Sequence, residues 1–100
     1  MILLFKLLVS HALCDYPLQG DFLAKAKNHK NGIIGVPFYI PLVCHSLIHS
    51  GGVYFCTGNI HFAFTELFLH TIIDYFKCDG AFGFQTDQIL HVICKLIYLL

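Results

Sequence analysis

The sequence predicts an all-α fold: a small four-helix integral membrane bundle with short loops and one polar cytoplasmic loop. Hydrophobic residues make up 57% of the chain and charged residues 12%, whereas soluble globular domains have about 45–50% and about 25%. The mean hydropathy is +0.71. Four apolar stretches alternate with polar or glycine-containing segments, and 100 residues suffice for one packed unit, so we expect a single domain over residues 1–100.

The charge and the cysteines exclude several classes of protein. The net charge is zero, with six lysines and no arginine, so the chain lacks the basic surface of a nucleic-acid-binding protein. The five cysteines are widely spaced and form no C-x-x-C pair, which favours their use as small apolar residues. The apolar N-terminal run has no basic residue before it and no A-x-A cleavage site after it, so we expect it to be retained as structure.

The first two apolar stretches predict helices over about residues 2–16 and 36–56. Pro17 disfavours helical geometry in the residue before it, which makes the first helix short for a membrane span of roughly 20 residues. Residues 33–56 contain no Lys, Arg, Asp or Glu and are the clearest transmembrane candidate. Pro37 suits the start of that helix, and Gly51 and Gly52 are expected to loosen its far end.

The last two apolar stretches predict helices over about residues 60–77 and 86–100. The segment 57–59 is a turn that is long enough only for an antiparallel helix pair, and Asn59 is the expected N-cap of the third helix. The glycine-containing segment 79–83 reads as a loop. Thr86 or Asp87 is then expected to open the fourth helix.

The segment 20–32 is the only strongly polar part of the chain and contains Lys25, Lys27 and Lys30. Positive charge in short loops favours the cytoplasmic side of a membrane, so we expect this loop inside and both termini outside. The predicted location is therefore a membrane that the chain crosses several times. The lipid bilayer is the predicted partner, and a homo-oligomer or a membrane partner subunit is compatible with this location.

Histidine and acidic residues recur at the one-face helical spacing of four. Five pairs have this spacing, against about 1.6 expected by chance from the number of these residues, whereas no pair is separated by three. Each predicted helix contributes at least one pair. The pairs are His11/Asp15, His45/His49, Glu66/His70, His70/Asp74 and Asp87/His91.

These residues are expected to face the interior and to bind a divalent metal. Acidic groups at the middle of a membrane helix cost about 2.5–3.5 kcal/mol each, so four of them facing lipid would cost roughly 10 kcal/mol. Imidazole with carboxylate suits zinc, manganese or iron, and a metal-bound water beside a free carboxylate is a hydrolytic nucleophile. The candidate metal ligands are His11, Asp15, His45, His49, His70, Asp74, Asp87 and His91, and the candidate catalytic carboxylates are Asp15, Asp74 and Asp87.

Several of these residues also have simpler interpretations. Asp87 suits the N-cap or first turn of the fourth helix, and Glu66 suits the headgroup region. His29 and His61 are expected to be solvated. The leading hypothesis is a metal-dependent hydrolase acting on a lipid or phosphoester. The alternatives are a non-enzymatic membrane module, whose buried network sets helix register or supports a partner subunit, and a proton or ion path. A soluble bundle with an unusual core is a further alternative, because the first and fourth helices are shorter than a full span.

Four motifs in order resemble a family of small bacterial and phage membrane proteins catalogued as domain of unknown function 3307. The first motif runs from His11 through Asp15 and Gln19 to Asp21, and it is followed by a lysine-bearing segment. The others are a histidine in the second helix and the motifs H-x-x-x-D-x-x-K and D-Q-x-x-H in the third and fourth. They are matched by His45, by His70, Asp74 and Lys77, and by Asp87, Gln88 and His91.

The resemblance implies a bacterial inner-membrane location and adds Gln19, Asp21 and Gln88 to the candidate site residues. It also implies a general similarity to membrane-bound metal-dependent hydrolases that carry His and Asp on short helices. Two residues depart from the pattern of the family. Cys14 replaces the usual glycine and Pro17 lies inside the first motif, which puts close packing at the first helix in doubt.

Overall fold

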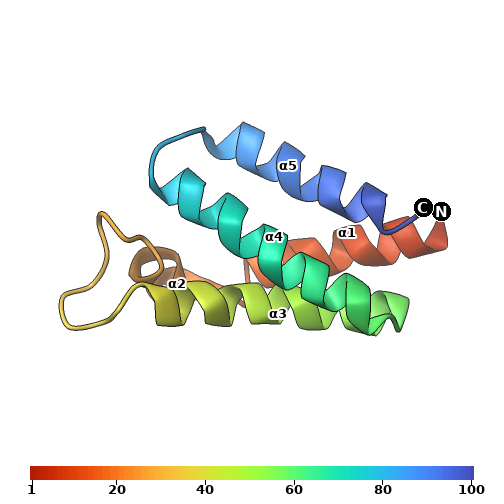
Figure 1. The fold of residues 1–100 in the computed structure, drawn as a ribbon, viewed down its shortest axis with the longest axis horizontal. Coiled ribbons are helices and arrows are strands. Elements are labelled where there is room, and N and C mark those ends of the chain that lie inside the picture. The colour runs from red at the N-terminus through yellow and green to blue at the C-terminus, as the bar shows by residue number, and fades with distance from the viewer.

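The computed structural model describes all residues from 1 to 100 and contains five α-helices and no strand (Figure 1). The helices are α1 (Ile2–Asp15), α2 (Gly20–Ala26), α3 (Tyr39–Thr57), α4 (Ile60–Cys78) and α5 (Phe84–Ile97). The all-α prediction is confirmed. The short helix α2 was not expected, since the sequence assigned its residues to a polar loop. Gly20 begins it with a φ of 66°, a left-handed conformation that glycine adopts without steric cost.

Local capping residues determine where α3 ends and α4 begins. Gly58 has a φ of 67° and donates its N–H to the carbonyl of Tyr54 at 2.7 Å. The Asn59 side chain then accepts hydrogen bonds from the N–H groups of His61 at 2.9 Å and Phe62 at 3.4 Å. The prediction of Asn59 as the N-cap is therefore confirmed.

The start of α5 differs from the prediction. The helix begins at Phe84, and its N-cap is Gly83 rather than Thr86 or Asp87. Gly83 has extended backbone geometry, and its carbonyl accepts the N–H of Asp87 at 3.0 Å. Asp87 consequently lies inside the first turn, where an acidic group is favoured by the helix dipole while its side chain remains available for other contacts.

The four long helices form an elongated bundle of 42 × 22 × 22 Å. In the chain order α1, α3, α4, α5, each long helix contacts the next, and α5 returns to contact α1, while α2 packs against α3. Both termini and the α3–α4 turn lie at one end of the bundle (Figure 1). The α2 segment and the α4–α5 loop lie at the opposite end. This up-and-down arrangement gives every long helix one face toward a common interior.

The interior of the bundle is polar and its exterior is apolar. Most of the 22 buried residues are polar or charged. Leu7 of α1, Val53 of α3 and Tyr98, which directly follows α5, form the apolar core cluster. In contrast, each long helix exposes large hydrophobic side chains. Examples are Phe5 on α1, Phe55 on α3, Phe64 on α4 and Ile89 on α5.

None of the five helices combines the length and the apolar character that crossing a membrane requires. The predicted integral membrane bundle is therefore supported only as an all-α bundle. The physical reasons differ between the helices: α1 and α5 have only 14 residues each, whereas α3 and α4, with 19 residues each, carry polar side chains along the face that they turn inward.

Candidate metal centre

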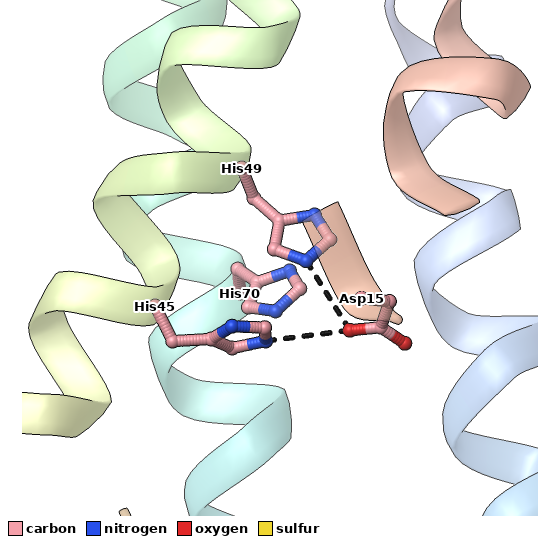
Figure 2. A group of neighbouring side chains, drawn as sticks. All are labelled: Asp15, His45, His49 and His70. Carbon is pink, nitrogen blue, oxygen red and sulfur yellow. Dashed lines mark hydrogen bonds and ion pairs between the residues drawn. The ribbon is translucent and has the colours of Figure 1, made fainter. Parts of the chain in front are cut away.

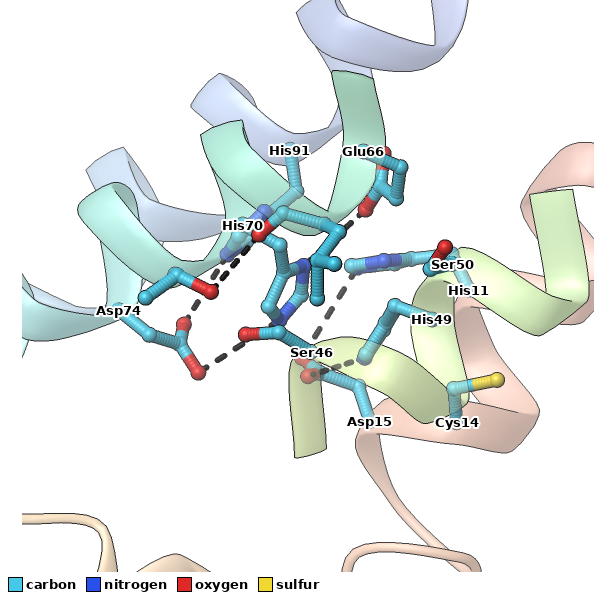
Figure 3. A network of polar contacts seen from close by, with 12 residues as sticks. His11, Cys14, Asp15, Ser46, His49, Ser50, Glu66, His70, Asp74 and His91 are labelled. Atoms are coloured by element: carbon cyan, nitrogen blue, oxygen red, sulfur yellow. Dashed lines mark hydrogen bonds and ion pairs between the residues drawn. The ribbon is translucent and has the colours of Figure 1, made fainter. Parts of the chain in front are cut away.

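The predicted site residues converge in the interior of the bundle. Side chains separated by four residues project to the same side of a helix, and the long helices turn these sides toward one another (Figure 3). Each of the eight predicted ligands has no more than 9% of its surface exposed. They come from α1 (His11, Asp15), α3 (His45, His49), α4 (His70, Asp74) and α5 (Asp87, His91).

Four ligand atoms on three helices form the most complete site. Asp15, His45, His49 and His70 each offer one atom, and these atoms all lie within 4.8 Å of one another (Figure 2). Asp15 Oδ1 is 3.3 Å from His45 Nε2 and 3.2 Å from His49 Nε2. Ligand atoms around a tetrahedral zinc ion with bonds of about 2.0–2.1 Å are separated by about 3.3 Å. The two separations from Asp15 Oδ1 therefore already match those between ligand atoms around a tetrahedrally coordinated ion.

Besides His45 Nδ1, two imidazole nitrogens in this site have no hydrogen-bond partner. They are His45 Nε2 and His70 Nε2, and both rings are almost completely buried. A buried polar atom without a partner costs about 1–3 kcal/mol. Coordination of a cation by both nitrogens would remove this cost, because an unprotonated imidazole nitrogen is a metal ligand.

Neighbouring side chains hydrogen-bond to atoms of the candidate ligands that do not face the site, and this orients the ligands. Gln88 donates its amide to Asp15 Oδ2 at 2.8 Å and accepts a hydrogen bond from His11 Nε2 at 3.1 Å. Asp15 Oδ1 is thus left to face the imidazoles of α3. His11 Nε2 lies 3.8 Å from Asp15 Oδ2, so His11 contacts this carboxylate mainly through Gln88. Such outer contacts hold metal ligands in their binding orientation.

Asp74 connects this group to a second one. Its Oδ2 atom lies 3.4 Å from His45 Nε2 and 3.5 Å from His70 Nε2, and its Oδ1 atom lies 3.2 Å from His91 Nε2. His91 Nε2 is also 3.2 Å from Asp87 Oδ1. Asp74, Asp87 and His91 thus form a further set of three buried ligand atoms.

Glu66 lies in the interior, as its pairing with His70 at the spacing of four predicts. The alternative interpretation, a place in the headgroup region, is not supported, because the structure buries Glu66 with 1% exposure. Its carboxylate accepts hydrogen bonds from His70 Nδ1 at 3.1 Å, Lys95 Nζ at 2.9 Å and Tyr98 Oη at 2.9 Å. Glu66, His70 and His91 also fit the distances of a metal site. Glu66 accepts three hydrogen bonds, whereas Asp15 and Asp74 accept two each and Asp87 accepts one, so we favour the other two sets.

Two buried lysines were not anticipated. Lys27 Nζ lies 2.7 Å from Asp74 Oδ2, and Lys95 pairs with Glu66 as described above. Lys95 follows His91 by four residues, so the helical spacing could have identified it as a member of the inward face. Lys27 lies at the end of the unexpected helix α2, and its pairing depends on the tertiary position of that helix.

The buried charges do not balance within the chain. Asp15, Glu66, Asp74 and Asp87 are buried, whereas only the ammonium groups of Lys27 and Lys95 are buried with them. With neutral imidazoles, the interior carries two excess negative charges. A single divalent cation would neutralise this excess, and buried charges require such compensation.

The remaining residues that the sequence analysis singled out offer no atom to any of the three ligand sets. Gln19 donates its side-chain amide to the backbone carbonyl of Asp15 at 3.1 Å, and Asp21 is exposed. His61 is exposed, as expected. His29 is not simply solvated, because it is partly buried at the α2 end of the bundle.

His29 and Lys30 fasten the loop after α2 to the end of α4. His29 Nε2 lies 2.9 Å from Asp79 Oδ1, and its ring stacks on Tyr75 with centroids 4.2 Å apart. Lys30 Nζ lies 3.3 Å from the same carboxylate oxygen. These contacts, first the hydrogen bond with His29 and then that with Lys30, lower the pKa of Asp79 below its ordinary value.

Comparison with known proteins extends over almost the whole chain. A family model described as "Protein of unknown function (DUF3307)" matches residues 3–100. No curated protein and no solved structure matches the chain. The match covers α1 to α5 and therefore all of the side chains that form the buried cluster. The chain thus belongs to the family described as "Protein of unknown function (DUF3307)".

Proposed function

We propose that this protein binds a divalent metal ion between Asp15, His45, His49 and His70. The observation that carries the proposal is the convergence of three imidazole nitrogens and one carboxylate oxygen within 4.8 Å in a buried site. Nitrogen and oxygen ligands of this kind suit zinc, manganese or iron. The unpartnered nitrogens of His45 and His70 and the two excess negative charges support the same conclusion.

A hydrolytic role follows if water has access to the bound ion. A metal ion lowers the pKa of its bound water, and a neighbouring carboxylate can accept the proton that this water loses. Asp74 lies beside the four ligands, with its Oδ2 atom within 3.5 Å of two imidazoles of the site. We propose a lipid or phosphoester as the substrate class. Water would attack the ester carbon or phosphorus, the ester bond would break, and the products would be an acid and an alcohol.

The polar interior supports a closed binding site better than a proton or ion path. A path would require polar groups from one end of the bundle to the other. The apolar cluster of Leu7, Val53 and Tyr98, against which Leu3, Cys56 and Phe62 pack, interrupts such a path.

We also propose that lipid surrounds the long helices. Phenylalanines project outward from α1, α3 and α4, with Phe55 89% exposed and Phe68 67% exposed. Soluble monomers rarely expose contiguous apolar patches larger than a few hundred Å². The inward side chains His45, Ser46 and His49 lower the apolar content of α3 without contributing to its outer face. An apolar exterior around a polar interior is the arrangement that a hydrocarbon environment favours.

Metal analysis tests the first proposal. The full chain, purified in detergent and stripped of metal, is loaded with zinc, manganese or iron, and the bound metal is measured after desalting. We expect at least one tightly bound ion per chain. His49→Ala should remove this ion, whereas the exposed control His61→Ala should retain it. Absence of a bound ion from the folded wild-type protein would show that the polar cluster is a structural network only.

Membrane extraction and a depth probe test the second proposal. We expect the chain to stay with membranes during carbonate extraction. Cys44 is exposed in the second turn of α3, so a polarity-sensitive fluorophore on it, in a variant without the other cysteines, should report an apolar environment in vesicles. Release by carbonate, together with a water-like fluorophore spectrum, would contradict a lipid location.

A further inference from the structure

The side chains of α4 and α5 form a second set of ligands beside the site proposed above. Asp74, Asp87 and His91 each have no more than 2% of their surface exposed, and their ligand atoms lie within 4.8 Å of one another. His91 Nε2 is 3.2 Å from Asp74 Oδ1 and 3.2 Å from Asp87 Oδ1. These separations are close to the distances between neighbouring ligands of one metal ion with bonds of about 2.0–2.2 Å.

One carboxylate oxygen of this second set, Asp87 Oδ1, has no hydrogen-bond partner. This oxygen is buried, whereas Gln88 donates to the other oxygen, Oδ2, at 3.2 Å. A carboxylate held by one oxygen and left free at the other is oriented for coordination. The first turn of α5 determines the position of Asp87, because the Asp87 N–H donates a hydrogen bond to the carbonyl oxygen of Gly83.

The two sets share Asp74. Its Oδ1 atom faces His91, whereas its Oδ2 atom faces His45 and His70 of the first site and also pairs with Lys27 Nζ at 2.7 Å. A carboxylate whose two oxygens face different ligand groups is placed to bridge two ions. Two-metal sites in proteins hold their ions about 3.5–4 Å apart. Gln88 connects the sets again, since its amide donates to both Asp15 and Asp87.

We propose that a second divalent metal ion binds to Asp74, Asp87 and His91, with Asp74 bridging it to the ion held by Asp15, His45, His49 and His70. This inference rests on the proposed function and extends it. The first site has four protein ligands, which is the closed arrangement typical of structural ions. The second has three, which leaves a coordination position open for water or a substrate oxygen.

The charge of the loaded site indicates the kind of substrate. One divalent ion neutralises the two excess negative charges of the interior, so a second ion leaves a net charge of two positive units with neutral imidazoles. A bound hydroxide or an anionic group compensates this charge. The second ion therefore favours an anionic substrate such as a phosphoester over a neutral ester.

Metal stoichiometry tests the inference and separates it from the first proposal. The metal-free full chain in detergent is titrated with manganese and zinc, and bound metal is counted per chain. We expect two ions in the wild-type protein, one in Asp87→Asn, one in His49→Ala and two in the control His61→Ala. Circular dichroism of each variant checks that the helices are retained.

A spectroscopic measurement on the wild-type protein avoids dependence on the variants. Two manganese ions joined by a carboxylate are magnetically coupled, so we expect an electron paramagnetic resonance spectrum that differs from that of isolated manganese. A single uncoupled ion in the wild-type protein would overturn the second site and leave the first intact. Two ions in folded Asp87→Asn would overturn the ligand assignment, and no bound ion would overturn both proposals.

Discussion

His70 Nδ1 lies 3.1 Å from Glu66 Oε2 and donates a hydrogen bond to it, because the carboxylate can only accept. This hydrogen bond determines which imidazole nitrogen is free. The proton resides on Nδ1, so the unpartnered Nε2 carries the lone pair and faces Asp15 and Asp74. In the proposed metal site, Glu66 would therefore orient His70 without contacting the ion, as in the carboxylate–histidine pairs found behind many zinc sites.

Replacing Glu66 should weaken metal binding while all of the ligands remain. Glu66→Gln keeps the size of the side chain but removes the charge that holds the His70 proton on Nδ1. The change also leaves the Lys95 ammonium unpaired, so it is best made together with Lys95→Met. We expect metal affinity to fall by about 10- to 100-fold in a zinc competition titration. An unchanged affinity in the folded double variant would show that His70 is not a ligand.

Lys27 should stabilise the metal-free protein more than the loaded one. Its ammonium lies 2.7 Å from Asp74 Oδ2, and both groups are buried. Lys27→Met leaves Asp74 without this compensating charge, and the loss of one partner of a buried pair costs about 3–5 kcal/mol. A bound metal ion supplies positive charge to the same carboxylate, so the loss should be smaller in the loaded protein. Chemical denaturation with and without metal measures both values.

Lys30→Met is the matched control for this change. Lys30 also pairs with a carboxylate, Asp79, at 3.3 Å, but both side chains are substantially exposed. Exposed ion pairs contribute about 0–1 kcal/mol, so we expect a small effect that metal does not alter. Equal destabilisation of Lys27→Met in the metal-free and loaded proteins would contradict a metal ion at Asp74.

Gly52 should be required for the contact between α1 and α3. A Cβ atom at position 52 would collide with Ser10 Oγ, whereas a Cβ atom at Gly51 meets nothing within 4 Å. Glycine to alanine inside a helix is ordinarily stabilising by roughly 0.5–1 kcal/mol. We expect Gly51→Ala to show this gain, and Gly52→Ala to lose it or to be less stable than the wild type. Thermal unfolding of both variants in the same detergent measures the difference.

The same pair of variants reports on the metal site. Asp15 lies on α1 and His49 on α3, so a shift between these helices changes the separation of two ligands. Gly52→Ala should therefore lower metal affinity, and Gly51→Ala should not. Equal affinity in the two variants would show that the α1–α3 contact does not set the ligand geometry.

Those features that depend on local sequence were predictable. Asn59 was identified as a cap because its role depends on residues adjacent in the chain. The inward faces of the four long helices followed from the spacing of histidine and acidic residues. Because a helix repeats every 3.6 residues, that spacing alone indicates which side chains lie together on one face.

Features that depend on how helices meet were not predictable. Lys27 was read as a loop residue, and its pairing with Asp74 arises only when α2 packs beside α3. The depth of Glu66 depends on contacts with Lys95 and Tyr98 from α5, and the helical spacing pattern says nothing of that packing. Which of the eight candidate ligands share one ion likewise depends on the angles and offsets between helices.

The loop after α2 should detach from α4 in acid. His29 and Lys30 hold the pKa of Asp79 below its ordinary value of 3.8, so the ionised carboxylate is favoured in the folded state. A group whose pKa is lower in the folded state than in the unfolded state stabilises the fold at pH values above its unfolded-state pKa. This stabilisation is lost as the pH falls through its folded-state pKa. We therefore expect docking to weaken below pH 3.8. The ring of His29 stacks on Tyr75, so the ring-proton chemical shifts of His29 in nuclear magnetic resonance spectra report the contact.

Asp79→Asn should weaken the contact at neutral pH and remove this acid transition, whereas the exposed control Asp21→Asn should retain it. An acid transition that persists in Asp79→Asn would assign the effect to another group.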